Sequence, residues 1–120
     1  MWHNILITSC GKRVALTISV KKTLTSFFPE GKVFTSDACP EYAPAGYFSD
    51  KCFQVPRVTS EDYIDTLLDI CFKYKVGLII PTIDTELAIL ARNKDVFAKH
   101  GIALIVSDIS FINIIRYAYE

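Results

Sequence analysis

The segment Ser9-Cys10-Gly11-Lys12-Arg13 carries groups that could bind an anion. It follows the apolar run 4–7 and precedes a helical pattern that begins at Val14. A glycine turn between a strand and a helix presents backbone N–H groups at the helix N-terminus, where they hold negative charge. The predicted ligands of a substrate carboxylate or phosphate are Ser9, Gly11, Lys12 and Arg13. The alternative is that the glycine only makes the turn and both cations are solvated.

A second polar segment, 82–86, follows the apolar run 77–81. Its predicted site residues are Thr82, Asp84 and Glu86. Their charge would favour an amine or a water-bound cation, and the carboxylates could act in acid–base chemistry or bind Mg²⁺. The structural alternative is a helix start, with Asp84 as the N-cap and Glu86 in the first turn.

A salt bridge between the two segments is a further alternative, either Arg13–Glu86 or Lys12–Asp84. Exposed ion pairs contribute only about 0–1 kcal/mol, so stability alone is a weak reason for this arrangement. Asp37, which ends the strand pattern 32–37, completes the predicted set of site residues.

Hydrophobic periodicity predicts the elements that would position these groups. Strands are expected near 4–7, 32–37, 51–56, 77–81 and 102–106. Helices are expected over 14–28, from a start at 59–62 to residue 72, over 87–100, and after Ser107-Asp108. The segment 38–50 is predicted to be a long functional loop.

This order predicts an α/β fold, a Rossmann-like three-layer α/β/α sandwich around a five-stranded parallel sheet. The expected strand order is 3-2-1-4-5, with a flavodoxin-like order as the alternative. In the first order, strands one and four are neighbours where the order reverses. The segment 9–13 would then face 81–86 across a crevice, with Asp37 one strand away.

Composition narrows the functional classes. The chain has 120 residues, 51% of them hydrophobic, which suits one domain with a real core. Its 13 basic and 13 acidic residues leave no electrostatic footprint for nucleic acid. No signal peptide and no apolar run of membrane-spanning length is evident, so a cytoplasmic protein without membrane contacts is expected.

The four cysteines, at positions 10, 39, 52 and 71, form no C-x-x-C pair and no zinc spacing. Cys52 and Cys71 fall in apolar patterns and are expected to be small core residues. Cys10 lies beside a predicted helix N-terminus and two cations, an environment that would lower its thiol pKa. No partner for nucleophilic catalysis is placed beside it by sequence.

Known nucleotide-binding motifs match poorly. The dinucleotide fingerprint requires three spaced glycines, and only Gly11 is present, although Asp37 could hold a ribose. The phosphate loop G-x-x-x-x-G-K-[ST] is absent. An NAD-linked oxidoreductase fragment remains one alternative, and a free-standing module that binds a nucleotide or effector is another.

Four stretches resemble the N-terminal domain of ATP-grasp enzymes, with the branch of the carbamoyl phosphate synthase large subunit nearest. They are Ile5 to Arg13, Thr35-Ser36-Asp37-Ala38, Val55-Pro56 with Asp62-Tyr63, and Ile80-Pro81-Thr82-Ile83-Asp84-Thr85-Glu86-Leu87. The resemblance implies that 1–120 is a pre-ATP-grasp domain, a fragment of a longer chain with a C-terminal ATP-grasp domain. The family's Asp-Lys pair near the last helix is replaced here by Tyr117 and Ala118.

The resemblance also implies a reaction class. Such enzymes activate a carboxylate as an acyl phosphate with ATP and Mg²⁺ and join it to an amine, thiol or related nucleophile. The first domain helps to shape the non-nucleotide substrate site, while the residues that grip ATP and Mg²⁺ lie further along. This domain alone is therefore expected to hold no cofactor, no metal ligand and no catalytic residue, and to leave ATP unhydrolysed.

The end of the chain predicts an association surface. A last helix would carry Phe111, Ile112, Ile114 and Ile115 and would be too apolar to be solvated all round. The helical pattern has no Gly or Pro stop before Glu120, as in a chain cut before another domain. A homodimer through this helix is the expected outcome in the isolated domain.

Overall fold

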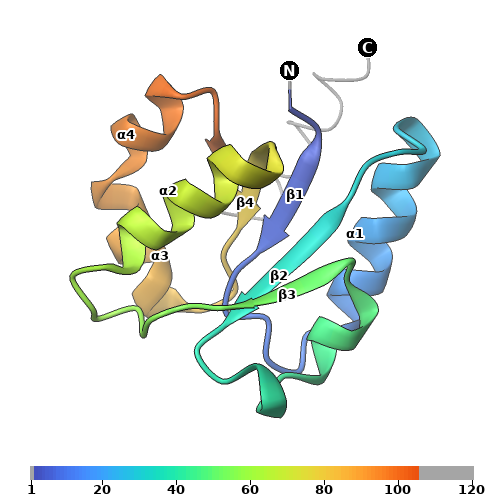
Figure 1. Ribbon diagram of the computed structural model, residues 1–120, viewed down its shortest axis with the longest axis horizontal. Coiled ribbons are helices and arrows are strands. Elements are labelled where there is room, and N and C mark those ends of the chain that lie inside the picture. The colour runs from blue at the N-terminus through green and yellow to red at the C-terminus, as the bar shows by residue number, and fades with distance from the viewer. Residues whose placement is uncertain (1, 106–120) are drawn as a thin grey trace.

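The computed structural model describes residues 2–105, and its centre is a parallel sheet of five strands (Figure 1). The strand order is β3-β2-β1-β4-β5, which confirms the predicted fold and excludes the flavodoxin-like order. The strands are β1 Asn4–Ile7, β2 Val33–Asp37, β3 Lys51–Gln54, β4 Val76–Ile80 and β5 Ala103–Leu104. The order reverses at the β1–β4 pair, where Ile7 lies beside Ile80.

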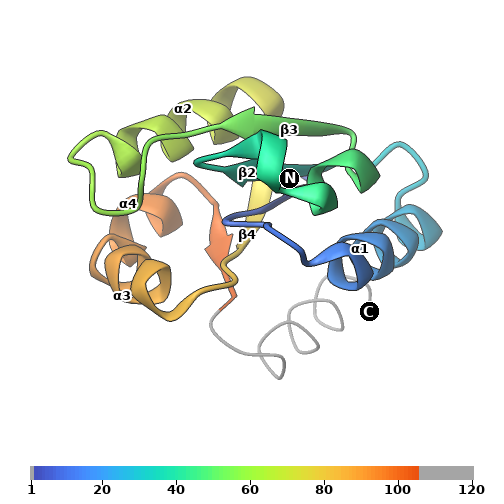
Figure 2. The ribbon, with the colours of Figure 1, turned by 90° about the horizontal axis from the view of Figure 1, so that it is seen from below.

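Helices cover both faces of the sheet, with α2 on one face and α1 on the other (Figure 2). The helices are α1 Val14–Phe27, α2 Tyr63–Tyr74, α3 Asp84–Arg92 and α4 Lys94–Lys99. Two 3-10 helices, η1 Pro40–Tyr42 and η2 Pro44–Phe48, structure the segment predicted as a long loop.

Two hydrophobic clusters hold the layers together. The cluster on the α2 face, called here the α2-side core, packs Leu6 and Ile79 with Leu67 of α2, Leu90 of α3 and Phe97 of α4. The cluster on the other face is called the α1-side core. The opposite cluster joins alternate residues of the same strands to α1 and η2, through Ile5, Ile7, Val20, Leu24 and Ala45. The alternation follows from the period of two along a strand, and strands buried on both faces explain the continuous apolar runs.

Two helical expectations differ from the structure. The single helix predicted over 87–100 is two helices, because the chain leaves helical geometry at Asn93. The Asn93 side-chain amide donates to the Ile89 carbonyl oxygen at 2.9 Å, a local bond typical of helix ends. Helix α2 begins at Tyr63, after a turn at the predicted capping residues. The predicted last helix and its dimer surface lie outside the described residues.

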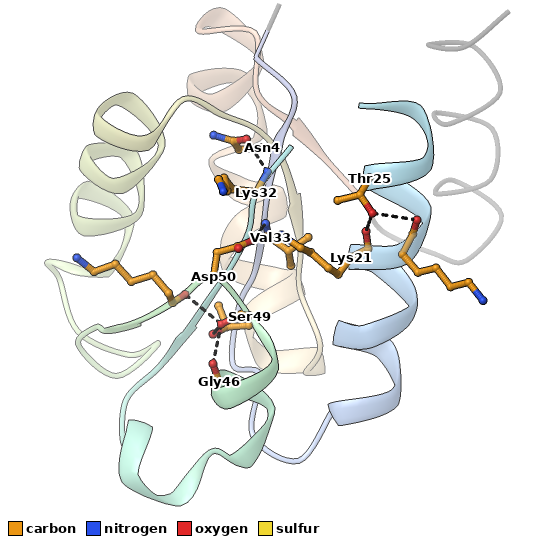
Figure 3. A network of polar contacts seen from close by, with 11 residues as sticks. Asn4, Lys21, Thr25, Lys32, Val33, Gly46, Ser49 and Asp50 are labelled. Atoms are coloured by element: carbon orange, nitrogen blue, oxygen red, sulfur yellow. Dashed lines mark hydrogen bonds and ion pairs between the residues drawn. The ribbon is translucent and has the colours of Figure 1, made fainter. Parts of the chain in front are cut away.

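Asp50 ties α1 to the sheet through one carboxylate oxygen (Figure 3). Its Oδ2 accepts from the Lys21 ammonium at 2.5 Å and from the backbone N–H of Val33 at 2.8 Å. Burial raises the pKa of Asp50, but the hydrogen bonds from Lys21 and Val33 outweigh it and leave the pKa below its ordinary value of 3.8. The carboxylate form is therefore favoured in the folded protein.

We expect this carboxylate to contribute to stability above pH 3.8, because a folded pKa below the unfolded one favours the folded state once both are ionised. The contribution is lost as the pH falls through the lower, folded pKa. Asp50→Asn should lower the free energy of unfolding by about 1 kcal/mol at pH 7, and the difference should shrink below pH 3.8. Urea unfolding at several pH values measures it, with the exposed Asp69→Asn as control. A difference that stays constant down to pH 2 contradicts this assignment.

Candidate functional site

The β1–α1 loop adopts an unusual backbone at the carboxyl edge of the sheet. Ser9 has a φ of 50° and Gly11 a φ of 45°, so two residues of one short loop are left-handed. Glycine adopts this conformation without steric cost, whereas serine does so only when its surroundings hold it. The Cys10 N–H donates to the Ser36 carbonyl at 3.0 Å and bends the loop toward β2.

Glu86 is the residue that holds Ser9. It lies in the first turn of α3, yet its side chain is fully buried, at 0% exposure. Its carboxylate accepts hydrogen bonds from the hydroxyls of Thr8, Ser9 at 2.6 Å and Tyr63 at 2.5 Å, and from the Thr82 N–H at 3.3 Å. One acid thus joins the ends of β1 and β4 to the first residue of α2.

The hydroxyl of Tyr63 serves this network as a fixed donor. Its pKa is raised by burial and by the charge and hydrogen bond of Glu86, so the phenol stays protonated. Tyr63 is 1% exposed, and its ring packs in the α2-side core. The aromatic side chain therefore anchors the carboxylate from the core side.

Thr82 closes the contact between the two turns. Its hydroxyl lies 2.6 Å from the carbonyl oxygen of Ser9 and 2.9 Å from that of Thr8. Its own carbonyl accepts from Arg13 Nη2 at 3.4 Å. The turns after β1 and β4 therefore meet, as the strand order predicts, and are joined mainly by polar contacts through Thr82 and Glu86.

Asp37 accepts a hydrogen bond from the Gly11 N–H, the backbone group that was predicted to bind a substrate anion. Its Oδ2 accepts the Gly11 N–H at 3.0 Å, and its Oδ1 accepts the Cys39 N–H at 2.9 Å. A carboxylate of the chain thus already sits where a substrate anion would meet that N–H. The same two bonds turn Asp37 toward the loop backbone.

Among the predicted site residues, the charged ones that are exposed are Lys12, Arg13 and Asp84. Helix α1 begins beside the first two with no side-chain cap and no acid in its first turn. Asp84 does not cap α3, because the N-cap is Ile83 and no side-chain cap bond is made there. Within 2–105 the recorded ion pair is Lys21–Asp50, so neither alternative salt bridge between the turns is formed.

The predicted site residues therefore divide into two groups. Ser9, Gly11, Asp37, Thr82 and Glu86 are linked to one another through the β1–α1 loop. The exposed group contains Lys12, Arg13 and Asp84. The carboxylate of Glu86, which was expected to favour an amine or a water-bound cation, is instead buried and accepts hydrogen bonds from the chain itself.

Thr8, Tyr63 and Ser36 are polar residues of this region that the sequence did not assign to it. Thr8 and Tyr63 contact Glu86, and both fall in apolar patterns that predict core positions. Ser36 follows Thr35, which lies beside Ile7, and its buried hydroxyl makes no hydrogen bond in the described structure. The sequence did offer one signal for these residues: each carries a hydroxyl at a position expected to be buried, and buried polar groups need hydrogen-bond partners.

The predicted environment of Cys10 is wrong. Its side chain is 0% exposed, and burial raises the thiol pKa to about 12, with contributions from Cys52 and Asp37 in the same direction. Desolvation disfavours the thiolate, and the groups that act on this thiol are Cys52, Thr35 and Asp37 rather than the two cations that follow it in the sequence. Cys71 is a buried core residue as predicted, and Cys52 packs at the edge of the α1-side core.

Two hollows are found in the described part of the chain. One, of about 210 Å³, is lined by Pro40, Glu41, Gly46 and Tyr47, next to the loop that η2 contacts through Ala45 N–H and the Gly11 carbonyl. The other, of about 560 Å³, is lined by residues 2–4, 28–31 and 75, around the start of β1 at the opposite edge of the sheet. Only the first adjoins the candidate site.

No grouping of three or more His, Cys, Asp or Glu side chains suited to a metal ion occurs between residues 2 and 105. Over the same residues, every helix is too short or too polar to cross a membrane.

Comparison with known proteins identifies the family of this chain. No curated protein matches the sequence. The family model described as "PylC-like, N-terminal domain" matches residues 5–105, a span that contains every candidate site residue and all the strand residues except Asn4. The chain belongs to the PylC-like N-terminal domain family, the pre-ATP-grasp domain of ATP-grasp enzymes.

Proposed function

We propose that this chain is the substrate-side domain of an ATP-grasp ligase similar to the carbamoyl phosphate synthase large subunit, and that its β1–α1 loop binds the anionic group of a small substrate. The observation that carries the proposal is that buried hydrogen bonds hold the β1–α1 loop in one conformation. Ser9 is held left-handed by Glu86 and Thr82, while the cations of Lys12 and Arg13 stay exposed beside the uncapped start of α1.

A carboxylate or phosphate suits this arrangement for electrostatic reasons. The first N–H groups of a helix carry partial positive charge, and two cations lie within the same turn of chain. Arg13 can add a bidentate contact to either anion. The bracing below the loop keeps these donors in place before the ligand arrives, which lowers the ordering cost of binding.

ATP and Mg²⁺ belong, in this proposal, to a following ATP-grasp domain. Among the described residues, the carboxylates of the site are engaged by hydrogen bonds, except that of Asp84, so the donor set fits a divalent cation poorly. The role of this domain is therefore to bind and orient the acid or its partner nucleophile. We expect a cytoplasmic enzyme of this class to join a carboxylate to an amine or a thiol.

The two other candidate functions receive less support. Asp37 points at the Gly11 and Cys39 N–H groups, so its carboxylate is not placed as the ribose ligand of a dinucleotide enzyme. A free-standing effector-binding module would use the same loop. It differs from the proposal in needing no ATP-grasp domain for its activity.

Arg13→Ala should weaken phosphate binding by about tenfold, because one charge-assisted hydrogen bond contributes roughly 1.5 kcal/mol. The measurement is a titration of the chain with inorganic phosphate and with acetate at fixed ionic strength, followed by calorimetry or backbone amide shifts. The matched control is Arg92→Ala, another exposed arginine, at the end of α3.

The shifts of wild-type protein should concentrate on residues 11–16, and the control should bind as the wild type does. Equal affinities of wild type and Arg13→Ala would overturn the site assignment. In an enzyme that contains the following domain, the same substitution should raise KM for the acid and leave KM for ATP unchanged. Retained ligand-dependent activity without that domain would favour the effector-binding module.

A further inference from the structure

We propose that Cys10 and Cys52 are a redox pair that closes to a disulfide and locks the β1–α1 loop to strand β3. All four cysteines are free thiols in the structure. The proposal concerns a modification of the chain itself and does not depend on which substrate the domain binds.

The backbone brings the two cysteines to the same place from distant parts of the chain. Cys52 lies beside Thr35 in the β2–β3 register, so both side chains point to the α1 face of the sheet. The hydrogen bond from the Cys10 N–H to the Ser36 carbonyl carries the loop across β2 toward β3. Both cysteines belong to the α1-side core.

Side-chain contacts also indicate that the thiols of Cys10 and Cys52 are neighbours. The Cys10 thiol interacts with the Thr35 hydroxyl and with the Cys52 thiol. Gly46 of η2 lies against Cys52 and Thr35, since a Cβ at that position would lie 2.8 Å from Cys52 Sγ and 3.7 Å from Thr35 Oγ1. Thr35 is therefore a common neighbour of both cysteines, because it lies beside Cys52 in the sheet and interacts with the Cys10 thiol.

The other two cysteines are excluded by position. Cys71 is buried in the cluster on the opposite, α2 face of the sheet. Cys39 follows β2 and is bound through its N–H to Asp37, and it is not among the groups that influence the Cys10 thiol. A specific pair is therefore expected, rather than mixed bridges among all four thiols.

The reaction requires an oxidant, which we take to be a small-molecule disulfide such as oxidised glutathione. The partly exposed Cys52, as thiolate, attacks one sulfur of the oxidant, forms a mixed disulfide and releases one thiolate. Cys10 then loses its proton to solvent and attacks the Cys52 sulfur, which releases the second thiolate. Two electrons pass from the protein thiols to the oxidant, which leaves as two thiols.

Burial controls the rate of the second step. Because burial raises the pKa of the Cys10 thiol to about 12, little thiolate is present at neutral pH. Closure should therefore accelerate by about tenfold per pH unit between pH 7 and 9, as the thiolate fraction rises.

Closure would alter the candidate site, because Cys10 stands between Ser9 and Gly11, the two left-handed residues of the loop. Tying this residue to β3 would restrict the backbone that presents Lys12 and Arg13. This effect on anion binding rests on the proposed function, whereas formation of the disulfide does not.

The experiment incubates the reduced chain with oxidised glutathione at pH 7, 8 and 9 and follows intact mass and peptide maps without reduction. The expected product has lost two hydrogens, contains a Cys10–Cys52 peptide and returns to the starting mass with a dithiol reductant. Cys52→Ser and Cys10→Ser should abolish it, and Cys39→Ser should leave it intact. Circular dichroism confirms the fold of each variant.

Three results would overturn the proposal. They are a stable glutathione adduct on Cys52 that never closes in folded wild-type protein, a bridge that involves Cys39 or Cys71, and closure that persists in Cys52→Ala. A phosphate titration of oxidised and reduced protein then tests the consequence for the site. A disulfide that forms without changing phosphate affinity upholds the redox pair and counts against the anion site.

Discussion

Glu86→Ala is expected to lower the free energy of unfolding by about 3–5 kcal/mol, because it removes the shared acceptor of several buried donors. The hydroxyls of Thr8 and Tyr63 would lose their partner while remaining 0% and 1% exposed, respectively. Each buried donor without an acceptor costs about 1–3 kcal/mol. Urea unfolding followed by circular dichroism measures the loss.

Two companion variants keep this prediction testable if the alanine variant fails to fold. Glu86→Gln retains the shape and one acceptor oxygen, and should cost about 1.5–3 kcal/mol because its amide group would face hydroxyl donors. Asp84→Ala, an exposed acid in the same first turn, should cost less than about 0.5 kcal/mol. Equal effects of Glu86→Gln and Asp84→Ala would show that the network does not support the fold.

Coupling to Tyr63 tests the network directly. Tyr63→Phe removes one donor to Glu86 and keeps the ring in the α2-side core. If the two groups act together, the double variant Tyr63→Phe with Glu86→Gln should lose less stability than the sum of the single variants, by about 0.5–3 kcal/mol. Strict additivity contradicts a direct contact between them.

Asp37→Ala is expected to move stability and phosphate affinity in opposite directions. The substitution removes the acceptor of the Gly11 and Cys39 N–H groups, so the free energy of unfolding should fall by about 1.5–3 kcal/mol. It also frees the Gly11 donor and removes a negative charge beside the loop. Phosphate should therefore bind more tightly, by about threefold or more.

The control for this variant is Asp69→Ala, which changes the net charge equally from an exposed position on α2. It should leave both quantities within error of the wild type, apart from a small general charge effect that salt screens. If Asp37→Ala weakens phosphate binding in a folded protein, Asp37 orients the loop for the ligand instead of competing with it. An unchanged affinity would separate the Gly11 donor from anion binding altogether.

The sequence by itself determined the architecture. Apolar runs at 4–7 and 77–80, each followed by a helical pattern, allow few arrangements once parallel crossovers are right-handed. The parallel sheet and the core position of Cys71 follow from that pattern. The structure chose the strand order 3-2-1-4-5 over the flavodoxin-like alternative, and the turns after β1 and β4 meet because of that order. These features depend on local periodicity and chain connectivity, which a sequence displays directly.

Local chemistry was less completely predictable. The break at Asn93 depends on a side-chain bond that competes with the helix, and nothing in the apolar spacing over 87–100 signals it. The segment 38–50 was expected to be a loop, but it winds into η1 and η2, each with a proline in its first turn. Such choices are decided by individual bonds worth about 1 kcal/mol.

Only the tertiary structure decided what the site residues do. A glutamate in the first turn of a helix is ordinarily solvated, but Glu86 faces Thr8, which lies 78 positions away in the chain, and Tyr63 of α2. Cys10 likewise has a raised thiol pKa because η2 and β3 bury it, although the neighbouring cations in sequence favour a lowered one. Desolvation and hydrogen bonding depend on which distant segments pack against a group, and that information arises only when the sheet and its helices assemble.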